Sequence, residues 1–139
     1  VRYVNNPSSS YCWIFTKDGR ARMARNFRVF LDEKNYPILF HCIGGADRTG
    51  ALAYVLNGVL GVSRREIETD WESTFYPRIP NRDAKGKRVW NSEQYFNEGF
   101  AKYGGANASW SERIVLYLKD CGITDEEIRR FRAIMLEKK

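Results

Sequence analysis

The sequence is poor in residues that mark several common classes of protein. It has only three cysteines and one histidine among 139 residues. An odd number of cysteines without a CxxC pair argues against a disulfide framework and against a zinc cluster. No apolar run approaches the roughly 20 residues of a membrane-spanning helix. We therefore expect one globular domain over residues 1–139, with no metal ion, no other cofactor and no transmembrane segment.

Cysteine usage favours a reducing compartment and hence the cytoplasm. No signal peptide is visible from Val1 onward. The chain begins without methionine, so a secreted or periplasmic location is the alternative if a signal peptide before Val1 has been removed. A single Cys12–Cys121 bridge stays open, and the oligomeric state is not specified by the sequence.

The net charge of +6 predicts a surface that attracts anions such as phosphoesters, acidic peptides, anionic lipids or nucleic acids. The arginines and lysines are scattered along the chain and form no dense block. No signature of a nucleic-acid-binding fold is present either. We therefore expect an anionic partner other than nucleic acid.

Hydrophobic periodicity predicts about six helices but only one convincing strand. The helices are expected at 17–34, 49–60, 92–103 and 125–137, with two more beginning after the capping boxes at Ser63 and Ser109. Residues 38–40, which follow Pro37, have the apolar pattern of a buried strand. A buried strand needs neighbours that satisfy its backbone groups. We therefore predict an α/β fold with a central sheet flanked by helices, and a chain that is the mainly helical C-terminal part of that domain, lacking its N-terminal strands.

The predicted strand leads through HCIGGADR into a helix, and this arrangement holds anions. Gly44 and Gly45 let the backbone curl around a ligand. The Arg48 guanidinium matches two phosphate oxygens. The same positive field should lower the pKa of Cys42 from its ordinary value of about 8.5 and so provide a nucleophile.

The ten residues at 41–50 resemble the His-Cys-x5-Arg-Ser/Thr-Gly loop of the protein tyrosine phosphatase superfamily. The matching positions are His41, Cys42, Arg48, Thr49 and Gly50. The fuller HCxxGxDRTG form is similar to the bacterial tyrosine and lipid phosphatase branch, which is related to the dual-specificity phosphatases. The resemblance covers mainly residues 36–71.

This resemblance implies a cysteine-dependent phosphatase in which Cys42 attacks phosphorus and forms a phosphocysteine intermediate. Arg48 and the loop amides would stabilise the phosphoryl oxygens. Thr49 would hydrogen-bond the sulfur, and His41 would order the loop and support a low thiol pKa. The phosphate would be bound by Ile43, Gly44, Gly45, Ala46, Asp47 and Arg48.

The resemblance leaves the identity of the general acid open. Residues 8–12, where much of the superfamily carries an aspartate, contain no carboxylate. Asp18 lies too near the loop, and it suits the start of a helix. Asp47 is the better candidate, because the branch is thought to use this aspartate; a carboxylate that orients the loop or Arg48 is the equal alternative.

The position before Asp47 departs from the branch, which commonly has lysine where this chain has Ala46. The change weakens the case for a phosphoinositide substrate, and the basic residues that could compensate are Arg20, Arg82 and Arg88. We predict hydrolysis of phosphotyrosine, with phosphoserine, phosphothreonine and phospholipids as further candidate substrates. A phosphate-binding pseudophosphatase without turnover is the alternative, and sulfur transfer or arsenate reduction is a minor one. The remaining cysteines and large aromatic residues are assigned to packing: Cys12, Cys121, Trp71, Phe75, Trp90 and Trp110.

Overall fold

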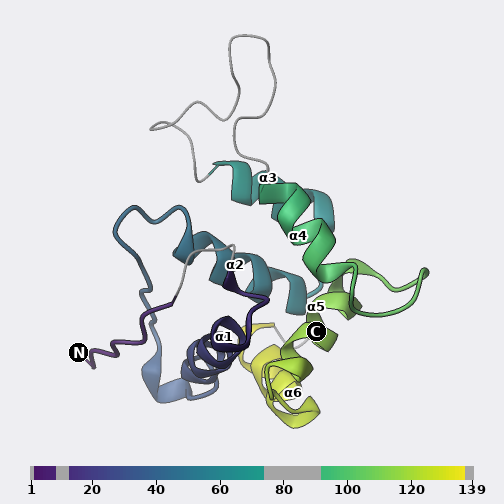
Figure 1. Cartoon of the computed structure of the whole chain (residues 1–139). Helices are drawn as coiled ribbons and strands as arrows, with labels where there is room; N and C mark the ends of the chain where they lie inside the picture. The colour runs from purple at the N-terminus through teal and green to yellow at the C-terminus, as the bar shows by residue number, and fades with distance from the viewer. Residues whose placement is uncertain (1, 9–12, 74–91, 137–139) are drawn as a thin grey trace.

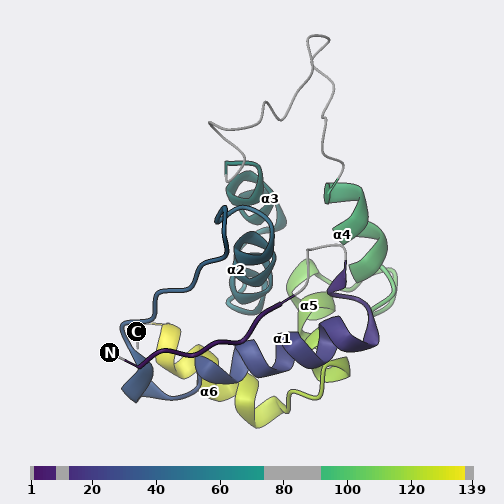
Figure 2. The ribbon, with the colours of Figure 1, turned by 60° about the vertical axis from the view of Figure 1, so that its left-hand side comes forward.

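The computed structural model describes residues 2–8, 13–73 and 92–136, and within these ranges the chain is helical. The helices are α1 (Lys17–Val29), the short 3₁₀ helix η2 (Glu33–Asn35), α2 (Arg48–Val59), α3 (Arg64–Ser73), α4 (Ser92–Phe100), α5 (Trp110–Asp120) and α6 (Asp125–Met135). Figures 1 and 2 show them in three tiers, with α3 and α4 on one side of α2 and α5, and α1 and α6 on the other.

The predicted α/β fold with a central sheet is wrong for the described part of the chain, which contains no strand. Residues 38–40 form neither a helix nor a strand, and no backbone hydrogen bond joins them to another described residue. Leu39 is 90% exposed rather than buried in a sheet. A strand depends on partners, and the described segments around this one are helices that keep their hydrogen bonds to themselves.

The first helix ends earlier than predicted. The Thr16 hydroxyl caps α1 by accepting a hydrogen bond from the N–H of Gly19 at 3.0 Å. Phe30 and Leu31 keep the helical spacing of apolar residues, although they already form the turn after Val29. Asp32 then accepts from the N–H of Lys34 at 3.1 Å and begins η2. The predicted segment 17–34 is therefore two helices separated by a turn.

At the junctions after α2 and α5, a glycine that ends one helix is followed by a capping box that begins the next. Gly61 has a φ of 84° and Gly122 a φ of 88°, a left-handed conformation that favours glycine. Ser63 and Glu66 bond each other's backbone N–H after the first junction. Thr124 and Glu127 do the same after the second, and Ser109 with Glu112 forms the predicted box at the start of α5. Local signals of this kind determine where these helices begin.

The core is built around α2, which packs against α1, α3 and α5. Val55 and Val59 are fully buried, and Gly58 lets α5 approach closely, because a Cβ there would lie 2.1 Å from Cδ1 of Ile114. The helix that follows the glycine-rich loop is therefore the most enclosed one of the bundle. The loop therefore leads into a helix that is packed against α1, α3 and α5.

Candidate active site

The glycine-rich loop occupies residues 42–47, between the extended segment and the first turn of α2. In Figures 1 and 2 the segment runs along the outside of the bundle before it turns into the helix. Gly45 has a φ of 71°, which an L side chain rarely adopts, and this turn brings the chain back toward α2. The N-terminal end of α2, with its partial positive charge, therefore closes the loop.

The half-buried thiol of Cys42 is the point on which the loop converges. Burial raises the pKa of this thiol, but hydrogen bonds from the Thr49 hydroxyl and from the backbone N–H groups of Thr49, Gly45 and Gly44 outweigh burial and lower it to about 7. About half of the molecules would therefore carry a thiolate at neutral pH. The loop stabilises negative charge at the position of the predicted nucleophile.

The hydroxyl of Thr49 is a hydrogen-bond donor to the sulfur of Cys42. Its oxygen is buried and meets no hydrogen-bond partner among the described residues in strict geometry. The same hydroxyl nevertheless lowers the pKa of Cys42. The two facts agree once the sulfur ionises, because a hydroxyl beside a thiol gains a strong acceptor only in the thiolate form.

Arg48 begins α2 and is half-buried, and its guanidinium makes no hydrogen bond or ion pair with any residue that the structure describes. Other arginines are engaged: Arg28 pairs with Glu127 at 2.6 Å and Arg64 with Glu68 at 2.7 Å. A half-buried guanidinium that has no partner among the described residues and adjoins a glycine-rich loop is typical of an anion-binding group.

Asp47 stands at the N-cap position of α2 but does not cap it with its side chain. Its backbone carbonyl instead accepts the N–H of Ala51 at 2.9 Å, the first hydrogen bond of the helix. The side chain of Asp47 therefore has no capping role in α2. Its predicted role as the acid stays a prediction.

His41 is exposed, and its Nδ1 lies 3.2 Å from the carbonyl oxygen of Cys42. With a proton on Nδ1, the ring would fix the backbone at the entrance to the loop. The groups that lower the pKa of Cys42 are Thr49 and the loop amides, and His41 is not among them. An ordering role for His41 therefore has a contact to support it, whereas its effect on the thiol has none.

The remaining sequence candidates lie elsewhere. Asp18 is in the first turn of α1, where it pairs with Arg22 at 2.6 Å, so it belongs to a helix as expected. Arg20 lies 3.3 Å from Asp120 at the end of α5. Cys121 is a free thiol. Trp71 is buried and Trp110 donates to the Tyr54 hydroxyl at 3.1 Å, which confirms their packing roles. Outside the described residues lie Cys12, Phe75, Arg82, Arg88 and Trp90.

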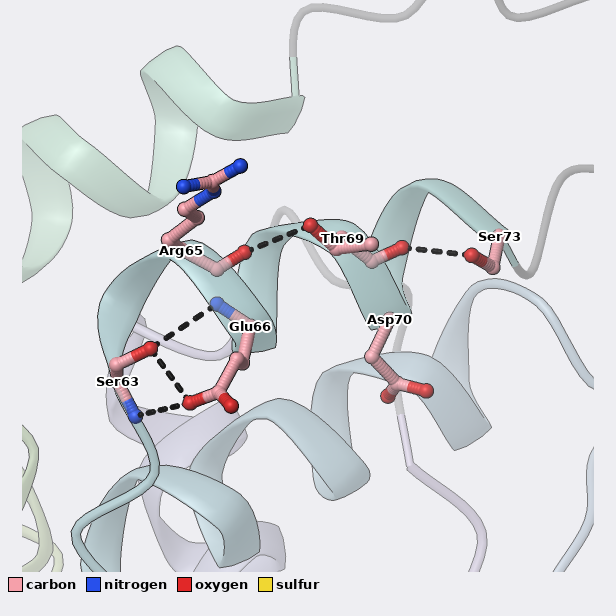
Figure 3. A pocket seen from close by; sticks show the side chains of 6 residues that line it. All are labelled: Ser63, Arg65, Glu66, Thr69, Asp70 and Ser73. Atoms are coloured by element: carbon pink, nitrogen blue, oxygen red, sulfur yellow. Dashed lines mark hydrogen bonds between the residues drawn. The ribbon is translucent and has the colours of Figure 1, made fainter.

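A surface depression runs along α3, and none of the loop residues lines it (Figure 3). Its polar side chains bond within their own helix: Ser63 with Glu66, Thr69 with the carbonyl of Arg65, and Ser73 with the carbonyl of Thr69. Arg65 and Asp70 point to opposite sides of the helix. The polar side chains that line the depression therefore do not point toward a common ligand position, and the loop at Cys42 is the candidate site.

One contact of the site is missing from the sequence analysis. The indole ring of Trp71 on α3 fills the space beside Gly50, in the first turn of α2. The only sequence signal was a glycine inside a helical pattern.

Among the described residues no three metal-ligating side chains come together. None of the described helices has the length and apolar character needed to cross a membrane.

Comparison with known proteins points to a single family. A model of the tyrosine phosphatase family matches residues 4–137, which includes the loop and every described helix. The comparisons with curated proteins and with solved structures gave no match.

Proposed function

Because the chain belongs to the tyrosine phosphatase family, we propose that it hydrolyses phosphate monoesters with Cys42 as the nucleophile. One observation carries the proposal: three backbone N–H groups and the Thr49 hydroxyl bring the pKa of the Cys42 thiol to about 7. Charge stabilisation at that sulfur serves nucleophilic attack, because the thiolate is the reactive form.

The first step forms a bond between the sulfur of Cys42 and phosphorus while the bond from phosphorus to the ester oxygen breaks. Asp47 gives a proton to the departing oxygen. Arg48 and the loop N–H groups hold the three remaining phosphoryl oxygens, whose charge increases in the transition state. Water then attacks phosphorus, the sulfur–phosphorus bond breaks, and the products are inorganic phosphate and the restored thiolate, with Asp47 accepting the proton of the water.

The substrate class that we favour is a phosphotyrosine peptide. Ile43, next to the nucleophile, is 94% exposed, and an aryl ring would bury apolar surface against it. Ala46 adds no positive charge to the loop, and Arg20 is held at Asp120. A head group with several phosphates would need more cationic partners than these residues provide. Phosphoserine, phosphothreonine and phospholipid substrates rank below phosphotyrosine.

The test is hydrolysis of a phosphotyrosine peptide in EDTA, with vanadate as inhibitor and rapid-quench detection of phosphocysteine. Cys42→Ser should lower kcat/KM by at least about 10⁴-fold, as loss of a nucleophile does. Cys121→Ser is the matched control, and it should stay close to the wild-type rate. Phosphoserine and phosphothreonine peptides and phosphoinositides, measured in parallel, should be poorer substrates.

Two results would reject this function. Turnover that survives Cys42→Ser, or that depends on Mg²⁺, would place the chemistry elsewhere. Tight binding of the phosphopeptide without phosphocysteine would favour a phosphate-binding protein without turnover.

A further inference from the structure

The contact between Gly50 and Trp71 joins the candidate site to the rest of the bundle. A Cβ on Gly50 would lie 2.7 Å from Cζ3 and 2.9 Å from Cε3 of Trp71. Both distances are shorter than any ordinary carbon–carbon contact, so the indole ring touches the backbone of α2 directly. Glycine is required at this position because Trp71 occupies the place of a side chain.

The indole ring is itself held from several directions. Trp71 is 4% exposed. Its ring meets the ring of Phe96 on α4 edge-on, with centroids 4.9 Å apart, and that of Tyr54 at 6.5 Å. Tyr54 lies one turn beyond Gly50 on α2, and its hydroxyl accepts from Nε1 of Trp110. Trp71 is therefore a fixed wedge between α4 and the first turns of α2, not a mobile side chain.

Gly50 is bonded to Thr49, and Thr49 follows Arg48. The N–H and the hydroxyl of Thr49 both act on the sulfur of Cys42. Backbone that close to the start of a helix moves with its first turn, so a displacement of Gly50 would also displace these donors. Hydrogen bonds weaken steeply with misalignment, so a small displacement suffices.

We propose that Trp71 is a positioning residue of the candidate site: by resting on Gly50, its ring fixes the first turn of α2 and thereby holds Thr49 and Arg48 in place relative to Cys42. Any catalytic consequence rests on the proposed phosphatase function. The geometric claim does not, because the state of the Cys42 thiol can be measured without a substrate.

The test is the pH dependence of iodoacetamide alkylation of Cys42, followed by mass spectrometry of the peptide that carries it. Trp71→Leu leaves space beside Gly50. It should raise the pKa of Cys42 by about one unit, which lowers the thiolate fraction at pH 7 about fivefold. Phe131→Leu is the matched control, because Phe131 on α6 is fully buried and packs against Phe27 on α1. It should lower the melting temperature to a similar extent and leave the alkylation profile unchanged.

Gly50→Ala provides a second test that keeps the indole ring. Its methyl group would push against Trp71, so it should raise the pKa of Cys42 in the same direction. Combining it with Trp71→Leu should restore part of the wild-type profile, because the smaller side chain makes room. Trp71→Phe is the milder change if Trp71→Leu does not fold, and it should give a smaller shift with the same sign.

An unchanged alkylation profile in folded Trp71→Leu or Trp71→Phe would overturn the proposal, as would an equal shift in Phe131→Leu. Where phosphatase turnover is measurable, Trp71→Leu should lower kcat more than it raises KM for the peptide. A thiol shift in a protein without turnover would support the positioning role and reject only the proposed function.

Discussion

The two described cysteines stand at opposite ends of helices, and their environments differ in sign. Cys42 precedes the N-terminus of α2, and its pKa is lowered to about 7. Cys121 is the residue that ends α5, and burial is the main reason why its pKa is raised to about 12. At Cys42 the hydrogen-bond donors outweigh burial, whereas at Cys121 they do not.

Arg48 follows Cys42 by six residues in the sequence, and Arg20 acts on Cys121 through space. Arg20 lowers the pKa of Cys121 slightly, but Asp120 opposes it and also pairs with Arg20 at 3.3 Å. Arg48 has no described partner. An arginine near a cysteine is therefore not sufficient to lower the pKa of the thiol and make it reactive. At Cys42 the converging donors of Thr49, Gly45 and Gly44 make the difference.

The largest loss of activity in this comparison should come from replacing Arg48. Arg48→Lys keeps a positive charge but loses the planar fork that binds two phosphoryl oxygens. We expect kcat/KM for a phosphotyrosine peptide to fall about 10²- to 10³-fold, the usual effect of losing a transition-state donor. Arg20→Lys is the control, and it should stay within about twofold of wild type, because surface ion pairs contribute little. Equal losses in both variants would contradict a special role for Arg48.

A somewhat smaller effect is expected from Asp47 in the loop; the carboxylate next to Cys121, Asp120, raises the pKa of that thiol and pairs with Arg20. If Asp47 protonates the leaving oxygen, Asp47→Asn should lower kcat about 10²-fold for phenyl phosphate. The loss should be much smaller for p-nitrophenyl phosphate, because its leaving group is less basic and needs less protonation. The measurement is the ratio of the two kcat values. An equal loss for both substrates would assign Asp47 to orienting the loop or Arg48.

The parts of the fold that the sequence predicted well depend on short-range rules. The order Gly61, Val62, Ser63 specifies a helix end followed by a new start, and the structure has both. The loop at Cys42 was found because its residues are contiguous. Their spacing along the chain is also their spacing around the sulfur.

The parts that failed depend on contacts between segments distant in sequence. Residues 38–40 carry a strand pattern, but a pattern contains no information about which segment would pair with it. The turn at Phe30 was misjudged because a buried aromatic residue fits equally well just beyond the end of a helix. The contact of Trp71 with Gly50 joins α3 to α2, so only the structure could place it.

The smallest expected effect concerns one hydroxyl beside each thiol. Thr49→Val removes the hydroxyl that lowers the pKa of Cys42 and keeps the shape of the side chain. The thiol should then titrate above pH 7, and alkylation at pH 7 should slow about threefold, while the rate above pH 9 should match wild type. Tyr117→Phe is the parallel change at Cys121, because the Tyr117 hydroxyl lowers the pKa of that thiol.

These two variants differ in the pH at which they can be detected. A lowered pKa makes Cys42 reactive above about pH 7, so the loss in Thr49→Val appears between pH 6 and 8. Burial raises the pKa of Cys121 to about 12, so Tyr117→Phe should leave its alkylation below pH 9 as slow as in wild type. If Thr49→Val alkylated at the wild-type rate at pH 7, the loop amides alone would account for the reactive sulfur, and the hydroxyl would be left to assist its departure from phosphorus.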